Sequence, residues 1–336
     1  MQVGIVGMGA IGGFIGVKLS TVTSVVGLDR VRPTPRPPTE EVTDVHGRSF
    51  LRGDLTVTTD PAGLAACEAV LVATKSSATS EVATQLAGVL PDDVPVVSMQ
   101  NGLRNAGRLR EHLGSRGLGG VVGYNVFRDG PQRLVQATEG KLFAGMTEGV
   151  AGARLRRLAA VLRRADERLN LEPDIDAVLA GKLLLNLNNG ICAVTGFPIV
   201  ASIKHRDARW CFAQAMHEGI RVMKAAGVSP KRATILPSPW IARLLALPDW
   251  LVLRVARSLV ELSPEARSST LQDLDRGSLT EIDELNGAIV WLAERAGVRA
   301  PVNGLVTELV HEHERAEGQP DFVSPEALRA RVERCL

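Results

Sequence analysis

The hexapeptide Gly7-Met8-Gly9-Ala10-Ile11-Gly12 restricts the possible folds more than any other stretch of this sequence. It directly follows the apolar run 2–6, which is typical of a buried strand, and it leads into a helical segment. In such a unit the first glycine makes a tight turn, the second lets backbone approach a pyrophosphate, and the third lets the helix pack on the sheet. The hexapeptide therefore predicts a Rossmann-type α/β fold that binds a dinucleotide. A glycine-rich turn without a ligand is the alternative.

Short β-branched runs alternate with helical segments up to residue 173, which favours a parallel sheet with helices on both faces. Further strands are expected between residues 119 and 145, near the edge of that sheet. The predicted strands of the sheet itself are 2–6, 23–28, 55–59, 69–74 and 95–99.

Helical periodicity dominates from residue 174 onward, in segments 207–226, 237–262, 278–296 and 303–315. Strands and helices in separate blocks indicate two domains. We expect a dinucleotide-binding Rossmann domain over 1–173, followed by an all-α domain over 174–336 that carries the substrate and the catalytic groups.

The end of the second predicted strand bears on the choice of nicotinamide cofactor. Asp29 stands about 20 residues after Gly9, where an acidic residue accepts hydrogen bonds from the ribose 2′-OH of NAD. Arg30 follows at once and could instead pair with the 2′-phosphate of NADP, and Arg32 and Arg36 in the proline-rich loop 31–39 could add positive charge. We expect NADPH because of Arg30, and NADH stays open because of Asp29.

Polar residues interrupt an apolar helical stretch in the second half, although each amide buried without a partner costs about 1–3 kcal/mol. Lys182 and Asn186 are spaced i,i+4 and project from one face, with Asn189 further along the same side. A second polar set lies within 268–287 and contains Ser269, Glu281, Asp283 and Asn286.

These groups suit the reduction of a 2-oxo acid, in which a carbonyl becomes an alkoxide and needs a proton donor. A lysine against an apolar wall has its pKa lowered toward the range useful for acid catalysis, and a carboxylate can orient it. The alternative is that Lys182 extends to solvent and that Asn189-Gly190 ends the helix as a C-cap.

Composition argues against several other classes of protein. A net charge of +2, dispersed arginines and a single tyrosine give no reason to expect nucleic acid. The N-terminus lacks a signal-peptide pattern, and no run approaches the ~18 apolar residues of a membrane span. The four cysteines and six histidines form no ligand spacing, so we expect reduced thiols, a cytoplasmic protein and no metal site.

The chain resembles the ketopantoate reductases (2-dehydropantoate 2-reductases) over nearly its whole length. The segment TEIDELNG followed by GV and PVN is the most specific part of the resemblance. The shared motifs are GMGAIGG at the N-terminus, TK at 74–75, QNG at 100–102, GKLLLN from 181, the segment SSTLQDLDRGSLTEIDELNGAIV, and AGVRAPVN ending at 303.

The resemblance implies a Rossmann domain, a helical domain and NADPH as cofactor. It implies that Lys182 is the general acid and Glu281 its catalytic partner, and that Asn101, Asn186 and Ser269 contact the substrate. The implied cofactor contacts are the Gly7–Gly12 turn, Arg30 at the 2′-phosphate, Lys75, Asn101 and Glu281.

The chain also departs from the family pattern. Gly190 and a residue near Val200 stand where the family has two further pantoate-contacting asparagines, and leucine-alanine replaces the tryptophan before GKLLLN. We therefore expect NADPH-dependent reduction of a 2-oxo acid, with ketopantoate as the leading substrate, by a possible homodimer. A paralogue acting on another 2-oxo acid or carbonyl, and a non-enzymatic NADPH sensor, are the alternatives.

Overall fold

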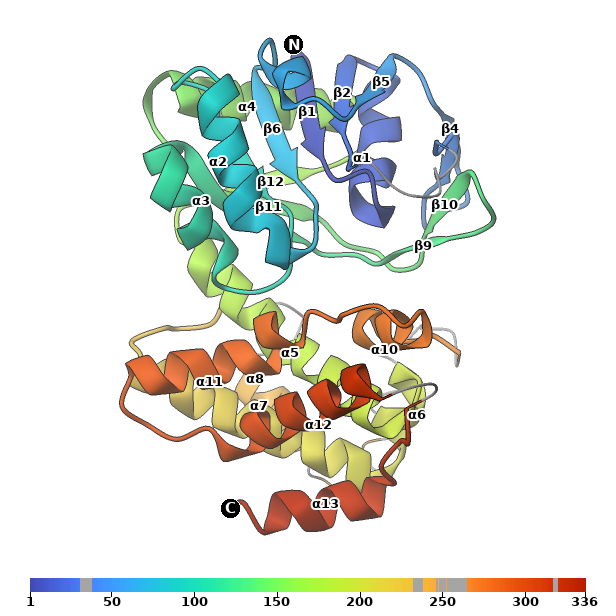
Figure 1. Ribbon diagram of the computed structural model, residues 1–336, viewed down its shortest axis with the longest axis vertical. Helices are drawn as coiled ribbons and strands as arrows, with labels where there is room; N and C mark the ends of the chain where they lie inside the picture. Colours follow the sequence, from blue (N-terminus) through green and yellow to red (C-terminus); the bar gives the residue numbers. More distant parts are fainter. Residues whose placement is uncertain (31–37, 232–237, 246, 248–251, 253–264, 317–319) are drawn as a thin grey trace. The chain divides into compact units, whose positions relative to one another are not determined.

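The computed structural model describes residues 1–30, 38–231, 238–245, 247, 252, 265–316 and 320–336 (Figure 1). The chain forms two compact units, Met1–Ile175 and Asp176–Leu336. The separate roles predicted for residues 1–173 and 174–336 stay predictions. Arg32, Arg36 and most of the helix expected over 237–262 lie outside the described residues.

An eight-stranded sheet forms the centre of the first unit. Neighbouring strands of this sheet pair in parallel, except that β11 pairs antiparallel with β8. The spatial order is β12 (Leu169–Glu172), β11 (Leu142–Gly145), β8 (Gly117–Val122), β7 (Val96–Ser98), β6 (Ala69–Val72), β1 (Gln2–Val6), β2 (Ser24–Leu28) and β5 (Leu55–Thr58).

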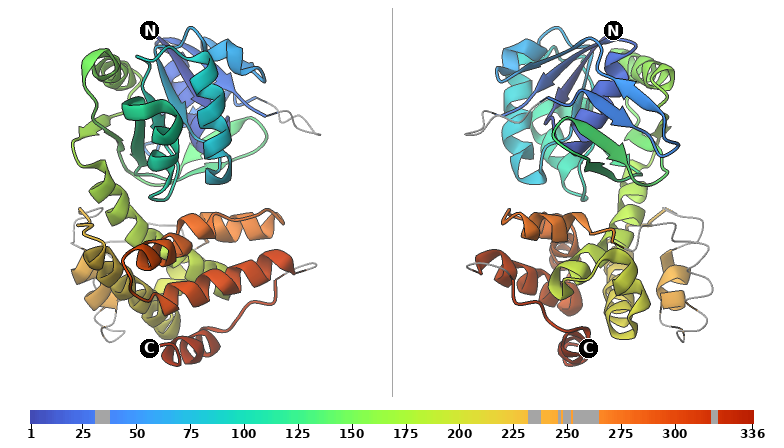
Figure 2. Two further views of the ribbon diagram at one scale, coloured as in Figure 1. Left: turned by 60° about the vertical axis from the view of Figure 1, so that its left-hand side comes forward. Right: turned by 90° about the vertical axis from the view of Figure 1, so that its right-hand side faces the viewer.

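Helices cover both faces of this sheet (Figures 1 and 2). Apolar side chains of α1 (Ala10–Ser20) and α4 (Gly149–Arg164) belong to one buried cluster, and those of α2 (Thr79–Val89) and α3 (Asn105–Leu113) belong to another. A strand buried on both faces must be apolar at every position, which is why the early strands have no alternation. The predicted Rossmann-type α/β fold is confirmed.

A second sheet of four short strands packs against α1. Its order is β4 (Ser49–Leu51), β3 (Glu41–Thr43), β10 (Arg133–Gln136) and β9 (Val126–Arg128). The prediction that all strands of 119–145 lie at the edge of the main sheet is therefore wrong for β9 and β10. Leu134 of β10 and Val42 of β3 share the buried cluster of α1, and this packing across α1 draws the two strands into a sheet of their own.

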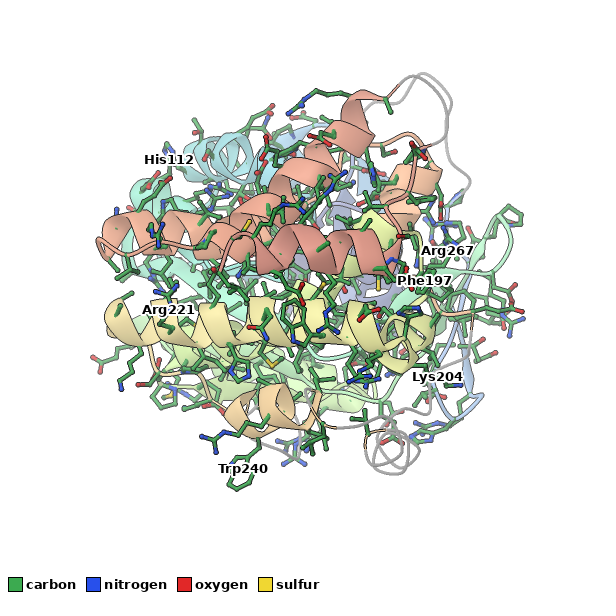
Figure 3. All side chains as sticks on the ribbon, turned by 90° about the horizontal axis from the view of Figure 1, so that it is seen from below. His112, Phe197, Lys204, Arg221, Trp240 and Arg267 are labelled. Atoms are coloured by element: carbon green, nitrogen blue, oxygen red, sulfur yellow. The ribbon has the colours of Figure 1, made fainter. Side chains whose placement is uncertain are left out.

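The second unit is helical, as predicted. Helices α7 and α12 pack against each other, and Arg221 of α7, labelled in Figure 3, donates a hydrogen bond to the carbonyl of Arg299, 2.7 Å away. The described helices are α5 (Ile175–Thr195), α6 (Ile199–Lys204), α7 (Arg206–Ala225), α8 (Ser238–Leu245), α10 (Ser269–Asp275), α11 (Asn286–Arg295), α12 (Pro301–Arg315) and α13 (Pro325–Glu333), with the 3₁₀ turn η4 (Ile282–Glu284). The segments predicted at 207–226 and 303–315 are confirmed as α7 and α12.

The single helix predicted over 278–296 is wrong, because α11 begins only at Asn286. The preceding backbone N–H groups bond elsewhere: Ile282 N–H donates to Thr280 Oγ1, and Thr280 N–H donates to Glu314 Oε1 on α12. These bonds hold residues 280–284 as a turn, and Glu281 stands on it.

α5 is long and apolar enough to cross a membrane by length and composition, but 78% of its most apolar window is buried inside the protein. The helix continues to Thr195, so the alternative in which Asn189-Gly190 ends it is wrong. A Cβ at Gly190 would lie 2.4 Å from Asn286 Oδ1 and 2.6 Å from Val306 Cγ1. Glycine at this position lets α11 and α12 pack directly on α5.

Candidate active site

The turn after β1 has the geometry expected of a phosphate-binding loop. Gly7 adopts φ +93°, and a Cβ at Gly12 would lie 2.0 Å from the Gly7 carbonyl oxygen, so both positions need glycine. A Cβ at Gly9 would have nothing within 4 Å, and no side chain caps the first turn of α1. The unbonded N–H groups of that turn and the open space beside Gly9 fit an anionic group.

Two other predicted residues lie at the same edge of the sheet. Strands β1 and β6 are neighbours although β2 and β5 come between them in sequence, so the chain reverses its winding direction there. A Cβ at Gly7 would lie 2.8 Å from Thr74 N, which places the segment before Lys75 against the glycine turn. Asn101 follows β7, the next strand of the sheet. Such a switch point is where open α/β sheets bind ligands.

A buried polar network holds these segments together. Gln100 Nε2 donates to the Thr74 carbonyl at 3.0 Å, and Gln100 Oε1 accepts from Ser98 Oγ at 2.9 Å. Asn105 Nδ2 donates to the Asn101 carbonyl at 2.6 Å and to Ser76 Oγ at 3.1 Å. The sequence drew attention to QNG but not to Asn105, which is polar and buried for this positioning of the backbone.

The end of β2 presents both residues that bear on cofactor choice. Arg30 is exposed, and its backbone N–H donates to Asp29 Oδ1 at 3.0 Å. One oxygen of the Asp29 carboxylate is therefore engaged locally, while the guanidinium of Arg30 extends into solvent.

Lys182 and Glu281 interact within the second unit although they are far apart in sequence. Burial lowers the pKa of Lys182 to about 8, and the Glu281 carboxylate opposes part of that effect. An amine with this pKa exists in both protonation states near neutral pH, so it can give and regain a proton.

The polar residues of α5 divide into two groups. Lys182, Asn186 and Asn189 are half-buried, and the Asn186 side chain has no hydrogen-bond partner among the described residues. Asn188 is instead buried, and its Nδ2 donates to Ser202 Oγ at 2.9 Å. The first group is partly exposed, whereas Asn188 belongs to the packing.

The amino-terminal end of α10 contacts the half-buried polar group of α5 at Asn189. Asn189 Nδ2 donates to Ser269 Oγ at 3.4 Å, and Ser268 caps the helix by accepting from Leu271 N–H. Arg267, labelled in Figure 3, forms two 2.7 Å bonds to Asp275 at the other end of α10. The structure thus brings the two polar sets of the sequence together at Asn189 and Ser269.

Two members of the second polar set have other partners. Asn286 is fully buried, and its Nδ2 donates to Asn303 Oδ1 at 3.0 Å, so it joins α11 to α12. Asp283 lies 3.0 Å from His311 Nε2. Val200, near which the family resemblance implies a further asparagine, is buried in α6.

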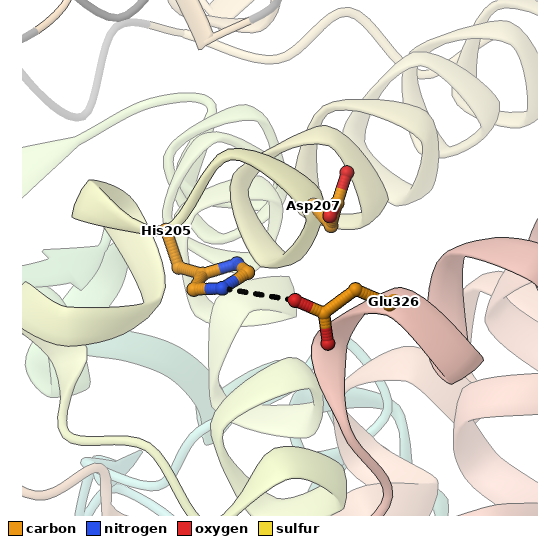
Figure 4. A group of neighbouring side chains, drawn as sticks. All are labelled: His205, Asp207 and Glu326. Carbon is orange, nitrogen blue, oxygen red and sulfur yellow. Dashed lines mark ion pairs between the residues drawn. The ribbon is translucent and has the colours of Figure 1, made fainter.

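His205, Asp207 and Glu326 form a cluster of possible metal ligands whose ligand atoms lie within 4.8 Å of one another (Figure 4). His205 Nε2 pairs with Glu326 Oε1 at 3.3 Å, and Asp207 already pairs with Arg329 at 2.8 Å. A cation would have to compete with that guanidinium, so the contacts are better explained as docking of α13 on α7.

Comparison with known proteins identifies the family of the chain. Residues 3–149 match the family "Ketopantoate reductase PanE/ApbA", and residues 174–314 match "Ketopantoate reductase PanE/ApbA C terminal". The chain is similar to the 2-dehydropantoate 2-reductase of Archaeoglobus fulgidus, with 30% identity over 245 residues that cover 71% of this chain and 74% of that protein.

Solved structures show the same fold. A PanE/ApbA family ketopantoate reductase from Ralstonia eutropha JMP134 superposes with a TM-score of 0.76 and 27% identity, covering 94% of this chain and 98% of that one. A D-mandelate dehydrogenase in ternary complex with NADH and anilino(oxo)acetate gives a TM-score of 0.74 at 16% identity over 94% of this chain and 98% of its own, which concerns the fold alone. The chain therefore belongs to the ketopantoate reductase family and is an NAD(P)H-dependent oxidoreductase.

Proposed function

We propose that this protein reduces a 2-oxo acid to a 2-hydroxy acid with NADPH, and that ketopantoate is the leading substrate. The observation that carries the proposal is the half-buried Lys182, whose pKa is lowered to about 8 beside Glu281, on a helix that also presents Asn186. Such an amine supplies the proton that an oxo-acid reduction requires.

Proton transfer follows from the surroundings of Lys182. As C2 of the substrate gains hydride, its oxygen becomes an alkoxide and takes a proton from the Lys182 ammonium. Burial favours the neutral amine that remains, which helps the transfer, while Glu281 keeps enough of the amine protonated beforehand.

Neutral polar groups would hold the substrate oxygens. Asn186 and Ser269 supply an amide and a hydroxyl in the second unit, and Asn101 supplies an amide in the first. Asn189 joins this set through its hydrogen bond to Ser269. Amides and hydroxyls orient a carboxylate without adding charge that would compete with Glu281 for Lys182.

NADPH would supply the hydride when bound. The Gly7–Gly12 turn would hold its pyrophosphate, because the first turn of α1 is uncapped and the space beside Gly9 is open. The exposed Arg30 would pair with the 2′-phosphate. Lys75, Asn101 and Glu281 would provide the remaining contacts.

A panel of substrates tests the proposal directly. We expect kcat/KM to be highest for ketopantoate among 2-oxo acids of different size, with NADPH preferred over NADH. An Arg30→Ala variant should lose most of the preference for NADPH and keep turnover with NADH. If no oxo acid were turned over although NADPH bound tightly, the result would instead support the alternative that the protein is a non-enzymatic NADPH sensor.

A different 2-oxo acid is the second candidate substrate. Gly190 faces Asn286 and Val306 with no room for a side chain, and Val200 is buried and apolar. Gly190 therefore cannot supply one of the two further asparagines that the family resemblance implies, and Val200, near the expected position of the other, does not supply it. A higher kcat/KM for another member of the panel would select this candidate. A cytoplasmic location and a homodimer stay predictions.

A further inference from the structure

The turn that carries Glu281 is attached to α12 by a cluster of charged side chains. His311 on α12 lies with Nδ1 2.7 Å from Glu314 Oε2 and with Nε2 3.0 Å from Asp283 Oδ1. The second oxygen of Glu314 accepts a 2.7 Å bond from Thr280 N–H. We call His311 and Glu314 the α12 clamp.

The α12 clamp holds the turn on both sides of Glu281. Thr280 immediately precedes Glu281, and Asp283 follows it by two residues. Within the turn, Ile282 N–H donates to Thr280 Oγ1 at 3.1 Å, and Glu284 N–H donates to the Glu281 carbonyl at 2.9 Å. The backbone of Glu281 is thus fixed from α12 rather than from α5, the helix that carries Lys182.

We propose that His311 and Glu314 are positioning residues that hold the Glu281 carboxylate beside Lys182, and that they thereby set the proton affinity of the Lys182 amine. This inference rests on the proposed function, because it is the role of Lys182 as acid that gives the position of Glu281 its importance.

The chemistry of His311 makes the α12 clamp sensitive to protonation. A protonated imidazole donates from both ring nitrogens, whereas a neutral one donates from only one. Burial lowers the pKa of His311, but its hydrogen bonds to Glu314 and Asp283 outweigh that effect and raise the pKa above 6.5. The charged groups that face the ring are Glu314 on its own helix and Asp283 on the turn.

Replacing His311 has two opposite effects on the pKa of Lys182, so the direction of the change shows which one dominates. Loss of any positive charge on His311 would by itself raise the pKa of Lys182, because a cation near the amine disfavours the ammonium. Releasing Glu281 from its position would lower that pKa, because the opposing carboxylate moves away. We expect the release of Glu281 to dominate and to lower the pKa of Lys182 by about half a unit to one unit.

The experiment measures the pKa of Lys182 by NMR titration of protein labelled with ¹³C at lysine Cε. The chain has seven lysines, and a Lys182→Met variant assigns the signal. The test variants are His311→Leu and Glu314→Gln, and His311→Lys restores a cation that both carboxylates can bind. The matched control is His313→Gln on the same helix, because His313 contacts the Ala193 carbonyl rather than the turn.

The expected result is a lowered pKa of Lys182 in His311→Leu and in Glu314→Gln, recovery in His311→Lys, and no shift in His313→Gln. The alkaline limb of kcat for oxo-acid reduction should move by the same amount. An unchanged or raised pKa of Lys182 in His311→Leu would overturn the inference, because loss of the Glu314 charge lowers that pKa by itself and only His311→Leu separates the two effects by sign. Absence of turnover by the wild type would count against the proposed function, while the titration would still decide the role of the α12 clamp.

Discussion

Lys182 places a charged side chain in an otherwise apolar helix, where that charge is costly for folding. The amine stands in a helix of leucines, and burial there lowers its pKa to about 8. Glu281 recovers part of the cost by stabilising the ammonium. The acid role proposed for Lys182 would give this costly charge a use in the reaction.

The pH dependence of catalysis should follow the protonation of Lys182. Reduction of the oxo acid needs the ammonium, so kcat should be level below about pH 8 and fall above it, since the pKa of Lys182 is about 8. Oxidation of the hydroxy acid needs the neutral amine, so its kcat should rise through the same range. Profiles measured in both directions check this, and a reduction rate that stays level to about pH 10 would contradict it.

Two adjacent asparagines on α5 should respond differently to truncation. Asn189→Ala removes a half-buried amide that bonds Ser269, so KM for the oxo acid should rise severalfold with little loss of stability. Asn188→Ala removes the buried amide that donates to Ser202 Oγ, which keeps its 2.8 Å bond to the Ile199 carbonyl, and should cost about 0.5–1.5 kcal/mol of unfolding free energy with KM nearly unchanged. Steady-state kinetics and urea unfolding of both variants make the comparison. The reverse pattern would remove Asn189 from the site.

The sequence predicts that Lys182 and Asn186 share a helix face, but it does not predict contacts between distant segments. The i,i+4 spacing of Lys182 and Asn186 is a local property, and the structure keeps both half-buried on α5. The pair of His311 with Asp283 depends on two segments 28 residues apart, and HEHERAEG has the pattern of an ordinary solvent-exposed helix face. Nothing local distinguishes such a contact.

At the scale of elements, α1 is anchored by a buried ion pair at the end opposite the glycine turn. Lys18 is 1% exposed and Glu167 is 7% exposed, and Lys18 Nζ lies 2.7 Å from Glu167 Oε1. Tyr124 donates a further hydrogen bond to Glu167 Oε2 at 3.2 Å. These bonds join α1 to the segment just before β12.

Breaking one partner of this ion pair should destabilise the protein strongly. Lys18→Met leaves the Glu167 carboxylate buried without its cation, and we expect a loss of about 3–5 kcal/mol in unfolding free energy. The double variant Lys18→Met/Glu167→Leu should recover most of the loss. Urea unfolding at neutral pH measures both. A single variant as stable as the wild type would show that the pair contributes little.

Elements could be predicted where their pattern is continuous and long. The buried strands β1, β2, β6 and β7 are apolar throughout, and α7 and α12 have clear helical periodicity. The three-residue strands β3 and β4 are too short for a pattern. The segment 280–284 continues a helical pattern in sequence but forms a turn, in which Ile282 N–H donates to Thr280 Oγ1 and Thr280 N–H donates to Glu314 Oε1.

At the scale of the whole molecule, cofactor binding should stabilise the folded state in a way that reports which cofactor is preferred. A ligand at 100 times its Kd adds about 2.7 kcal/mol, so NADPH should raise the thermal midpoint more than NADH at equal concentration. Arg30→Ala should remove most of that difference. Thermal unfolding with each cofactor tests this, and an equal or larger effect of NADH would assign the ribose site to Asp29.

The fold class and the family can be predicted from short sequence motifs. A glycine turn between strand and helix defines the first unit, and the family motifs cover nearly the whole chain. Substrate identity does not follow in the same way, because it depends on which side chains surround Lys182. For example, the sequence does not show why glycine stands at position 190, whereas the structure shows that Asn286 and Val306 leave no room for a side chain there.

Replacing Lys182 by methionine tests the central claim most directly. The measurement is kcat for NADPH oxidation with ketopantoate, or with whichever oxo acid the panel selects, together with the Kd of NADPH. We predict that Lys182→Met lowers kcat by about 10² to 10⁴ and leaves the Kd of NADPH nearly unchanged. A variant that binds NADPH normally and turns over near the wild-type rate would contradict the assignment of Lys182 as the acid.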